Sequence, residues 1–333
     1  MKTNFLFLSL LTLSLVACSD DEGTVVIPTP QTEVVVVTSS NTSGKVTISR
    51  PLSASASVKT LQIPSADTDG VYYSLSDEIL VASRTNNKLE VYGGIQNAAD
   101  MASLTMAYAS TSDFNNARET AVSGDKVVVT QDQNLANGNT NKLIVYQKTA
   151  SGLVLQNSYT VDFKTWGIFI DGTTLYAVAD LTGDIVVFNN FFSNPNGAII
   201  PNKRVTIAGL VRTHGIVYSS SDNKMILTDV GLAASDNDGG LIVINNFSSV
   251  LNATANMGTI PTTSQVRVYG PNSTLGNPVD VAYDSMTGKI FIAERLNAGG
   301  RLLTFNLPTT SGDALPAAAR VEAGISSVYA DRR

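Results

Sequence analysis

A three-strand pattern that recurs about every 48 residues constrains this chain more than any other feature of its sequence. The clearest copy spans residues 213–246, with short apolar runs at 214–218, 224–228 and 241–244. Turns rich in Ser, Asn, Asp and Gly separate these runs. Short runs of Val, Ile and Tyr between such turns are typical of β-strands, and no helical period competes with them. We therefore expect an all-β fold.

Five complete copies of the pattern follow one another along the chain. First strands are expected at residues 70–73, 120–123, 167–170, 215–218 and 280–283. Their second residues are 50, 47, 48 and 65 positions apart, close to the period of about 40 to 50 residues found in propeller blades. Second strands are expected at 79–83, 127–131, 175–180, 225–229 and 290–294, and third strands at 88–92, 142–146, 184–188, 241–245 and 301–305. The longest interval predicts extra loop between Phe247 and Ser264.

A sixth copy is divided between the two ends of the chain. Residues 325–330 have the form of a first strand, and residues 34–38 and 44–48 have the form of second and third strands. Pairing the two ends would close the ring and remove its exposed sheet edges. The sequence thus predicts a six-bladed β-propeller of four-stranded antiparallel blades. It occupies residues 33–333 as a single domain, with the C-terminal strand innermost in the closing blade.

The N-terminal segment predicts export and a membrane anchor. Lys2 precedes an apolar run at 5–16, which is too short to span a bilayer and reads as the core of a signal peptide over residues 1–17. The sequence Leu15-Val16-Ala17-Cys18 resembles the lipobox of bacterial lipoproteins, which implies a lipid on Cys18 and attachment to the membrane. An ordinary secretory cleavage site or a buried free thiol is the alternative.

The segment after Cys18 is expected to be a flexible tether over residues 18–32. Its Ser19-Asp20-Asp21-Glu22 resembles the acidic export signal of surface lipoproteins in Bacteroidetes, although a solvated acidic tether explains it equally well. The resemblance implies an outer-membrane lipoprotein that is exposed at the cell surface or faces the periplasm.

Composition excludes some functions. Without residues 1–17 the chain carries 21 basic and 28 acidic residues, so its net charge is about −7, which argues against binding to nucleic acid. Cys18 is the only cysteine, so the folded domain has no intramolecular disulfide. We expect a monomer.

The repeats resemble NHL and related six-bladed propellers. The match is clearest at Asn277-Pro278-Val279-Asp280-Val281-Ala282-Tyr283-Asp284, followed by Gly288-Lys289-Ile290-Phe291-Ile292-Ala293-Glu294. It covers most of residues 33–330 as a periodic pattern. Propellers with unrelated functions share such patterns, so the resemblance implies a fold and leaves the activity open.

In propellers, first strands begin and second strands end around one mouth of the central channel. The residues that this rule selects as a candidate ligand site are Asp69, Arg84, Glu119, Asp132, Trp166, His214, Asn277 and Arg295. His214 and Trp166 are the only residues of their types. A neutral His214 would suit a general base, and the Trp166 ring would stack on a sugar. Alternatively, His214 only bonds a neighbouring loop and Trp166 only covers the channel.

Asp180, Asp229 and Glu294 occupy equivalent positions in three consecutive copies. Converging carboxylates are ligands that Ca²⁺ or Mg²⁺ prefers, and Asn277 would add an oxygen. The arrangement is similar to single-metal hydrolases of the gluconolactonase type, which implies a metal that polarises a lactone or ester carbonyl. Their early Glu-Gly-Pro motif is absent from this chain. The alternative is that the acids cap turns by accepting backbone N–H bonds.

No complete catalytic motif appears in the sequence. There is no Gly-x-Ser-x-Gly elbow, and His214 has no evident serine partner. We therefore predict a lipid-anchored module of the cell envelope that binds or scaffolds a small-molecule, glycan or protein ligand. The enzyme alternative is a Ca²⁺- or Mg²⁺-dependent lactonase-like hydrolase with its site at the channel mouth.

Overall fold

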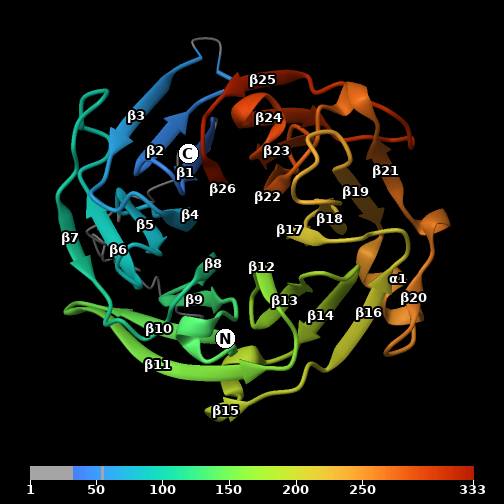
Figure 1. Cartoon of the computed structure of the whole chain (residues 1–333), viewed down its shortest axis with the longest axis horizontal. Helices are drawn as coiled ribbons and strands as arrows, with labels where there is room; N and C mark the ends of the chain where they lie inside the picture. Colours follow the sequence, from blue (N-terminus) through green and yellow to red (C-terminus); the bar gives the residue numbers. More distant parts are fainter. Residues whose placement is uncertain (1–32, 54–55) are drawn as a thin grey trace, which may run out of the picture. The chain divides into compact units, whose positions relative to one another are not determined.

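Six sheets stand side by side around a common axis and form a ring (Figure 1). The computed structural model describes residues 33–53 and 56–333. The expected signal peptide (1–17), the lipidated Cys18 and the tether (18–32) lie outside the described residues. No helix in the described ranges is long and apolar enough to cross a membrane. The predicted all-β, six-bladed propeller is confirmed.

Each blade is a meander that runs from the axis outward. The innermost strands are β4 (Thr68–Tyr73), β8 (Ala117–Ser123), β12 (Thr165–Asp171), β17 (Thr213–Ser219), β22 (Pro278–Asp284) and β26 (Ile325–Arg332). The second strands are β5 (Glu78–Ser83), β9 (Lys126–Gln131), β13 (Thr174–Ala179), β18 (Lys224–Asp229), β23 (Lys289–Glu294) and β1 (Val34–Ser40). The third strands are β6 (Lys88–Gly93), β10 (Asn141–Thr149), β14 (Asp184–Phe188), β19 (Gly240–Asn245), β24 (Arg301–Asn306) and β2 (Lys45–Ser49). The fourth strands are β7 (Met106–Ala109), β11 (Gly152–Val161), β16 (Lys203–Ile207), β21 (Val266–Tyr269), β25 (Ala318–Val321) and β3 (Val58–Gln62).

Two blades depart from the predicted four strands. A short parallel strand, β15 (Gly197–Ala198), adds to β11, and another, β20 (Thr259–Ile260), adds to β16. The long interval between copies was predicted to be loop, but it contains α1 (Phe247–Ala253) and β20. The buried Phe247 and Leu251 of α1 join the core between two blades, which is why this segment is ordered. The short 3-10 helices are η1 (Leu135–Asn137), η2 (Phe191–Ser193), η3 (Thr262–Ser264), η4 (Pro271–Ser273) and η5 (Asn297–Gly299).

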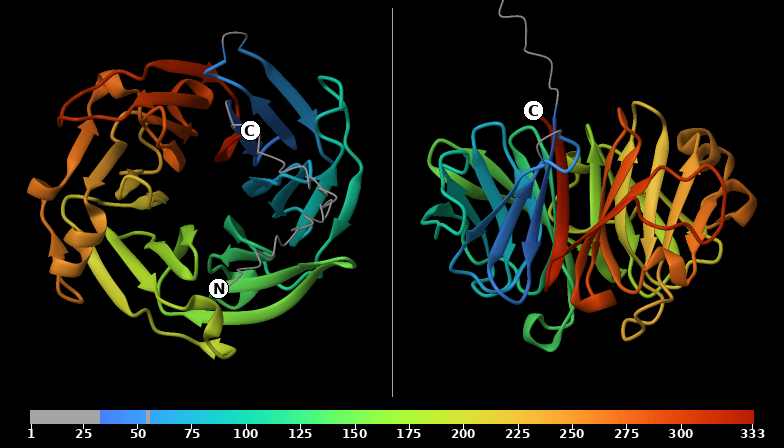
Figure 2. Two further views of the ribbon diagram at one scale, coloured as in Figure 1. Left: turned by 180° about the vertical axis from the view of Figure 1, so that it is seen from behind. Right: turned by 90° about the horizontal axis from the view of Figure 1, so that it is seen from above.

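The ring closes by pairing the two ends of the described chain, as predicted. Strand β26 is antiparallel to β1, in a register that runs from Val34 opposite Arg332 to Ser40 opposite Ile325. Beyond the strands, the backbones of Glu33 and Arg333 exchange hydrogen bonds of 3.0 and 2.8 Å. Figure 2 shows β26, in red, standing beside the blue N-terminal strands.

The hydrophobic core is divided among the interfaces between neighbouring blades. Six buried clusters each combine side chains from two adjacent sheets. At the closing interface, for example, Val34 and Val36 of β1 pack with Phe291 of β23 and with Ile325 and Val328 of β26. Each blade is therefore stabilised by its two neighbours.

The third residue of each inner strand forms the tightest layer of the ring. These residues are Gly70, Glu119, Gly167, Gly215, Asp280 and Ser327. A Cβ atom on Gly167 would lie 2.1 Å from the carbonyl oxygen of His214, and one on Gly215 would lie 2.9 Å from the carbonyl carbon of Asp280. Glycine is thus required where neighbouring inner strands approach each other closely.

A β-bulge interrupts the inner strand next to this layer in five blades. The register shifts lie at Asp69/Val71, Ala117/Thr120, Thr165/Ile168, Thr213/Ile216 and Pro278/Asp280. Bulges of this kind redirect side chains and are frequent next to binding sites. The layer of third residues lies between two cavities, one on each side.

Candidate functional site

The second residue of every inner strand lines one cavity of about 340 Å³. These residues are Asp69, Arg118, Trp166, His214, Val279 and Ser326. Loop residues complete the lining, among them Arg84, Arg212, Asn277 and Arg295. We call this space the arginine cavity, after Arg84, Arg118, Arg212 and Arg295. It lies where the inner strands begin, the end at which the sequence placed the ligand site.

Six of the eight predicted ligand residues line the arginine cavity. They are Asp69, Arg84, Trp166, His214, Asn277 and Arg295. Glu119 lines the cavity on the other side of the tight layer. Asp132 lies behind the wall, where its carboxylate accepts from Arg118 at 3.1 Å. The predicted site is thus brought together in large part.

Sequence reasoning missed Arg118 and Arg212. In β8, Glu119 takes the layer position that Gly167 takes in β12, so Arg118, one residue earlier, is the equivalent of Trp166 and His214. The sequence pattern instead matched Thr120 to the glycines of the other inner strands, because Glu119 differs from glycine in size and polarity. Trp166 and His214 each precede the layer residue of their strand by one position. The same position in β8 is Arg118, so the repeat could have identified it.

Trp166 is held between a cation and an imidazole. Its ring stacks on that of His214 at 3.7 Å between centroids and 9° between planes. The guanidinium carbon of Arg118, from the blade on the other side, lies 4.1 Å from the indole centroid. Both neighbours stabilise the indole, Arg118 through a cation–π contact. Because these contacts occupy the ring faces, the indole is not presented for stacking on a sugar.

A chain of alternating charges runs along this wall. Asp69 accepts from Arg84 at 2.8 Å and lies 3.7 Å from Arg118. Asp132 links Arg118 to Lys164, 3.5 Å away, and Asp180 links Lys164 to Arg212. The sequence of charges is Arg84, Asp69, Arg118, Asp132, Lys164, Asp180 and Arg212. These pairs fix the orientation of three of the four guanidinium groups.

Asp180 is the most heavily used acceptor of this chain of charges. It receives Arg212 Nε at 2.9 Å, Lys164 Nζ at 3.2 Å and the backbone N–H of Leu181 at 2.7 Å. It also lies 3.1 Å from Nε2 of His214. Burial would raise the pKa of Asp180, but the hydrogen bonds to His214 and Arg212 hold that pKa well below its usual range. Asp180 is therefore ionised at neutral pH.

His214 is neutral at pH 7. Burial lowers the pKa of its imidazole to about 4, although the bond to Asp180 opposes that shift. Since Asp180 is an acceptor, the single ring proton belongs on Nε2, and Nδ1 is left as a buried acceptor without a hydrogen-bond partner in the described part of the chain. The contact of Nε2 with Asp180, which follows β13, agrees with the alternative that His214 bonds a neighbouring loop.

Arg295 and Asn277, like His214, have buried polar atoms in the cavity without a hydrogen-bond partner in the described part of the chain. Arg295 forms no ion pair with any residue in the described ranges, and its Nε is buried without a hydrogen bond. The Oδ1 atom of Asn277 is also buried and unpartnered, while its Nδ2 donates to the carbonyl of Ala233 at 3.1 Å. Buried polar groups are normally satisfied, so these two indicate a ligand or water.

The predicted metal ligands do not converge. Asp229 accepts from the backbone N–H groups of Val211 and Arg212 and from Tyr269 Oη at 3.0 Å. Both oxygens of Glu294 accept from backbone N–H groups, at distances of 2.8 to 3.0 Å; the donors are Gly276, Asn277, Leu296 and Asn297. Burial raises the pKa of Glu294, and these N–H groups oppose that rise.

These contacts do not suit a hard cation. The oxygens of Asp180, Asp229 and Glu294 already accept from N–H or O–H donors, and a metal ion would have to displace them. Within residues 33–53 and 56–333, no group of three or more His, Cys, Asp or Glu is arranged to hold a metal ion. Asp229 and Glu294 cap turns by accepting backbone N–H bonds, which was the alternative considered from the sequence. Asp180 instead belongs to the chain of ion pairs.

Comparison with known proteins supports the fold and does not identify a family or a function. No protein-family model and no curated protein sequence matches this chain. Among solved structures, a chain of the nidogen/laminin complex is similar, with a TM-score of 0.60 and 10% identity over 89% of this chain and 98% of that one. A protein of unknown function from Bacteroides caccae has a TM-score of 0.56 and 10% identity over 91% of this chain and 100% of that one. A candidate 6-phosphogluconolactonase from Bacteroides uniformis has a TM-score of 0.56 and 12% identity over 91% of this chain and 87% of that one. These similarities show the fold of the chain, a six-bladed β-propeller.

Proposed function

We propose that this protein is a cell-envelope binding module that holds an anionic small molecule in the arginine cavity. The observation that carries this proposal is Arg295, which has no ion-pair partner within residues 33–53 and 56–333 and lies beside three oriented guanidinium groups in one cavity of about 340 Å³. A planar guanidinium forms paired, charge-assisted hydrogen bonds with carboxylate or phosphate. The volume lies in the range of small-molecule sites.

The unpartnered polar atoms would give the site its specificity. Asn277 Oδ1 and His214 Nδ1 are acceptors without partners in the described ranges, so they would receive hydroxyl or amide groups of the same ligand. A ligand with one anionic group and neighbouring hydroxyls, such as an acidic or phosphorylated sugar, combines both features. An acidic side chain of a protein partner would meet the same arginines, and the nidogen/laminin relative is itself part of a protein complex.

The effect of Arg295→Ala tests this proposal. Calorimetric titration with glucose 6-phosphate and with glucuronate is expected to give binding that is roughly 10- to 100-fold weaker in the variant, since a hydrogen bond to a charged group is worth about 1.5–3 kcal/mol. Neutral glucose is the matched ligand that lacks the charge. Arg50→Ala is the control, because Arg50 is only partly buried, pairs with Glu33 and does not line the cavity. Equal affinity in Arg295→Ala and Arg50→Ala would refute the assignment.

A metal-dependent lactonase remains the alternative, and the candidate 6-phosphogluconolactonase relatives are its support. It is the weaker proposal because the three carboxylates are occupied by other donors. Hydrolysis of a sugar lactone that requires added Ca²⁺ or Mg²⁺ would favour it over binding alone. A metal-free protein without turnover at millimolar Ca²⁺ would remove it.

The lipid anchor is a separate proposal that rests on the sequence. If Cys18 carries lipid, Cys18→Ala should move the protein from the membrane fraction to the soluble fraction, because acyl chains supply about 0.8 kcal/mol for each buried methylene. Ser19→Ala is the matched control, and we expect it to stay with the outer membrane. Retention of Cys18→Ala in the membrane fraction would show that the lipobox interpretation is wrong.

A further inference from the structure

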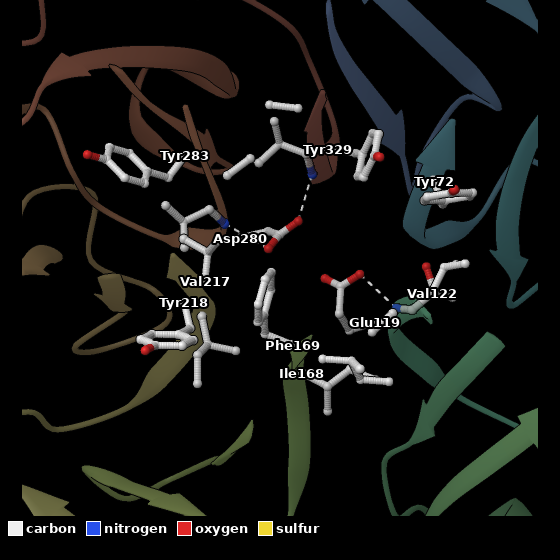
Figure 3. Close-up of a pocket in the computed structure, with 18 of the residues that line it drawn as sticks. Tyr72, Glu119, Val122, Ile168, Phe169, Val217, Tyr218, Asp280, Tyr283 and Tyr329 are labelled. Carbon is white, nitrogen blue, oxygen red and sulfur yellow. Dashed lines mark hydrogen bonds between the residues drawn. The ribbon is translucent and has the colours of Figure 1, made fainter. Parts of the chain in front are cut away.

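A second cavity, of about 400 Å³, lies on the other side of the tight layer, where the inner strands end. Five aromatic side chains contribute to its walls: Tyr72, Phe169, Tyr218, Tyr283 and Tyr329. We call it the aromatic cavity. Figure 3 shows these rings around two carboxyl groups, those of Glu119 and Asp280. No residue lines both this cavity and the arginine cavity.

The two carboxyl groups face each other across the ring axis. Glu119 belongs to β8 and Asp280 to β22, and these inner strands are three blades apart, so they lie on opposite sides of the ring (Figure 3). Both side chains are buried, with exposed fractions of 8% for Glu119 and 7% for Asp280. Backbone N–H groups hold them in place: Thr120 donates to Glu119, and Val281 and Val328 donate to Asp280, each at 2.7 Å.

Burial makes this pair difficult to ionise fully. Burial raises the pKa of Asp280 to about 7, against the opposing effect of its N–H donors. Burial, and then the negative charge of Asp280, raise the pKa of Glu119 well above its usual value. The negative charge of one carboxylate opposes the ionisation of the other, so a doubly ionised pair is unfavourable at neutral pH.

The charges around the aromatic cavity are of one sign. The described residues that line it include Glu119, Asp171 and Asp280 and no Lys, Arg or His. The arginine cavity, in contrast, is lined by four arginines against Asp67 and Asp69. The two ends of the ring axis therefore differ in charge, and the same anion would not suit both cavities.

The hydroxyl group of Thr120, in contrast to the two carboxyl groups, has no hydrogen-bond partner among the described residues. Thr120 is 8% exposed and lines the cavity beside Glu119. Its Oγ1 atom is buried without a hydrogen bond from any described residue. A buried hydroxyl without a partner indicates a ligand or water at this place. It adds a hydrogen-bonding group that is independent of the two acids.

We propose that the aromatic cavity binds a small organic cation with a primary ammonium group, which lies between Glu119 and Asp280 while its hydrocarbon part packs among the aromatic rings. Aromatic faces attract cations, and the attraction grows when the cation is removed from water. An ammonium group brings three N–H donors, which matches two carboxyl groups and the Thr120 hydroxyl. On binding, a proton held by one of the two carboxyl groups leaves to the buffer, so the cation that enters is balanced by the proton that leaves.

The test uses 2-phenylethylammonium as the probe and 2-phenylethanol as its neutral match, titrated into the full chain by calorimetry. The amine is expected to bind roughly tenfold or more tightly than the alcohol, and Glu119→Gln should remove most of that difference. Arg295→Ala, in the other cavity, should bind the amine as the unmodified protein does. Equal binding of amine and alcohol, or no binding of the amine at millimolar concentration, would overturn the proposal. So would an equal loss of amine binding in Arg295→Ala.

A second measurement needs no variant and therefore stands even if Glu119→Gln fails to fold. Titrations of the amine at pH 6, in buffers with different heats of ionisation, report the protons that are exchanged on binding. Release of a proton from the carboxyl pair makes the apparent binding heat differ between phosphate and MES. Binding of the amine without any proton release would contradict its placement between Glu119 and Asp280.

Discussion

Deletion of residues 325–333 is expected to leave a chain that no longer folds as a stable monomer. This segment is the inner strand of the closing blade, and Ile325 and Val328 are buried against β1 and β23. On the other side, Tyr329 contacts Tyr72 at 5.0 Å, and Ser326 Oγ donates to the carbonyl of Thr68 at 2.7 Å. Its loss would open two blade interfaces and expose the edge of β1. The cost is comparable to the whole stability of a domain, about 5–15 kcal/mol.

Chemical denaturation and light scattering check this expectation. The truncated chain should show no cooperative unfolding transition, or should associate through the open edge. A circular permutant is the matched control. It joins residue 333 to residue 33 and opens new ends after the exposed Ala314, so all four strands of the closing blade are kept. We expect the permutant to unfold cooperatively as a monomer. A truncated chain as stable as the permutant would show that the closure is not needed.

The second large effect is expected from Asp180→Ala. Its carboxylate is inaccessible and holds Arg212, Lys164 and His214 together, so its removal leaves two half-buried cations and the buried imidazole without their shared acceptor. Breaking a buried pair by removing one partner costs about 3–5 kcal/mol. Urea denaturation should therefore show a free energy of unfolding that is lower by about that amount.

The control for this prediction is Asp162→Ala. Asp162 is exposed, and its side chain forms no hydrogen bond or ion pair with any described residue, so its replacement should change the free energy of unfolding by less than about 0.5 kcal/mol. If Asp180→Ala were as mild as Asp162→Ala, the chain of charges would not support the wall of the arginine cavity. A free energy of unfolding of the unmodified protein that rose strongly with added Ca²⁺ would instead indicate that Asp180 has a metal partner.

The repeat predicts the fold well because one physical rule acts six times. In every repeat, short apolar runs form the inner, second and third strands, and polar turns separate them. The blades and their closure therefore follow from the sequence. Strands β15 and β20 were not predicted, because two-residue parallel pairings leave no periodic signal. The helix α1 was missed because its buried side chains, Phe247 and Leu251, are too few to show a helical period.

The sequence predicted the positions of the cavity residues better than it predicted their contacts. Trp166 and His214 fall at equivalent positions, and they do line one cavity. The role of Asp180 depends on Lys164 and Arg212, which follow no motif and meet only in the folded ring. The Glu119 and Asp280 pair is also invisible in the sequence, because strands three blades apart bring the two together.

The central claim, that the arginine cavity receives an anion, is tested most directly by the fluorescence of Trp166. Trp166 is the only tryptophan of the chain and lies in the wall of this cavity, between Arg118 and His214. Titration of the full chain with glucose 6-phosphate or glucuronate should therefore give a saturable change in its emission, whereas glucose and 2-phenylethylammonium should leave it unchanged. An emission that does not respond to either anion at millimolar concentration, or that responds equally to glucose, would contradict the claim.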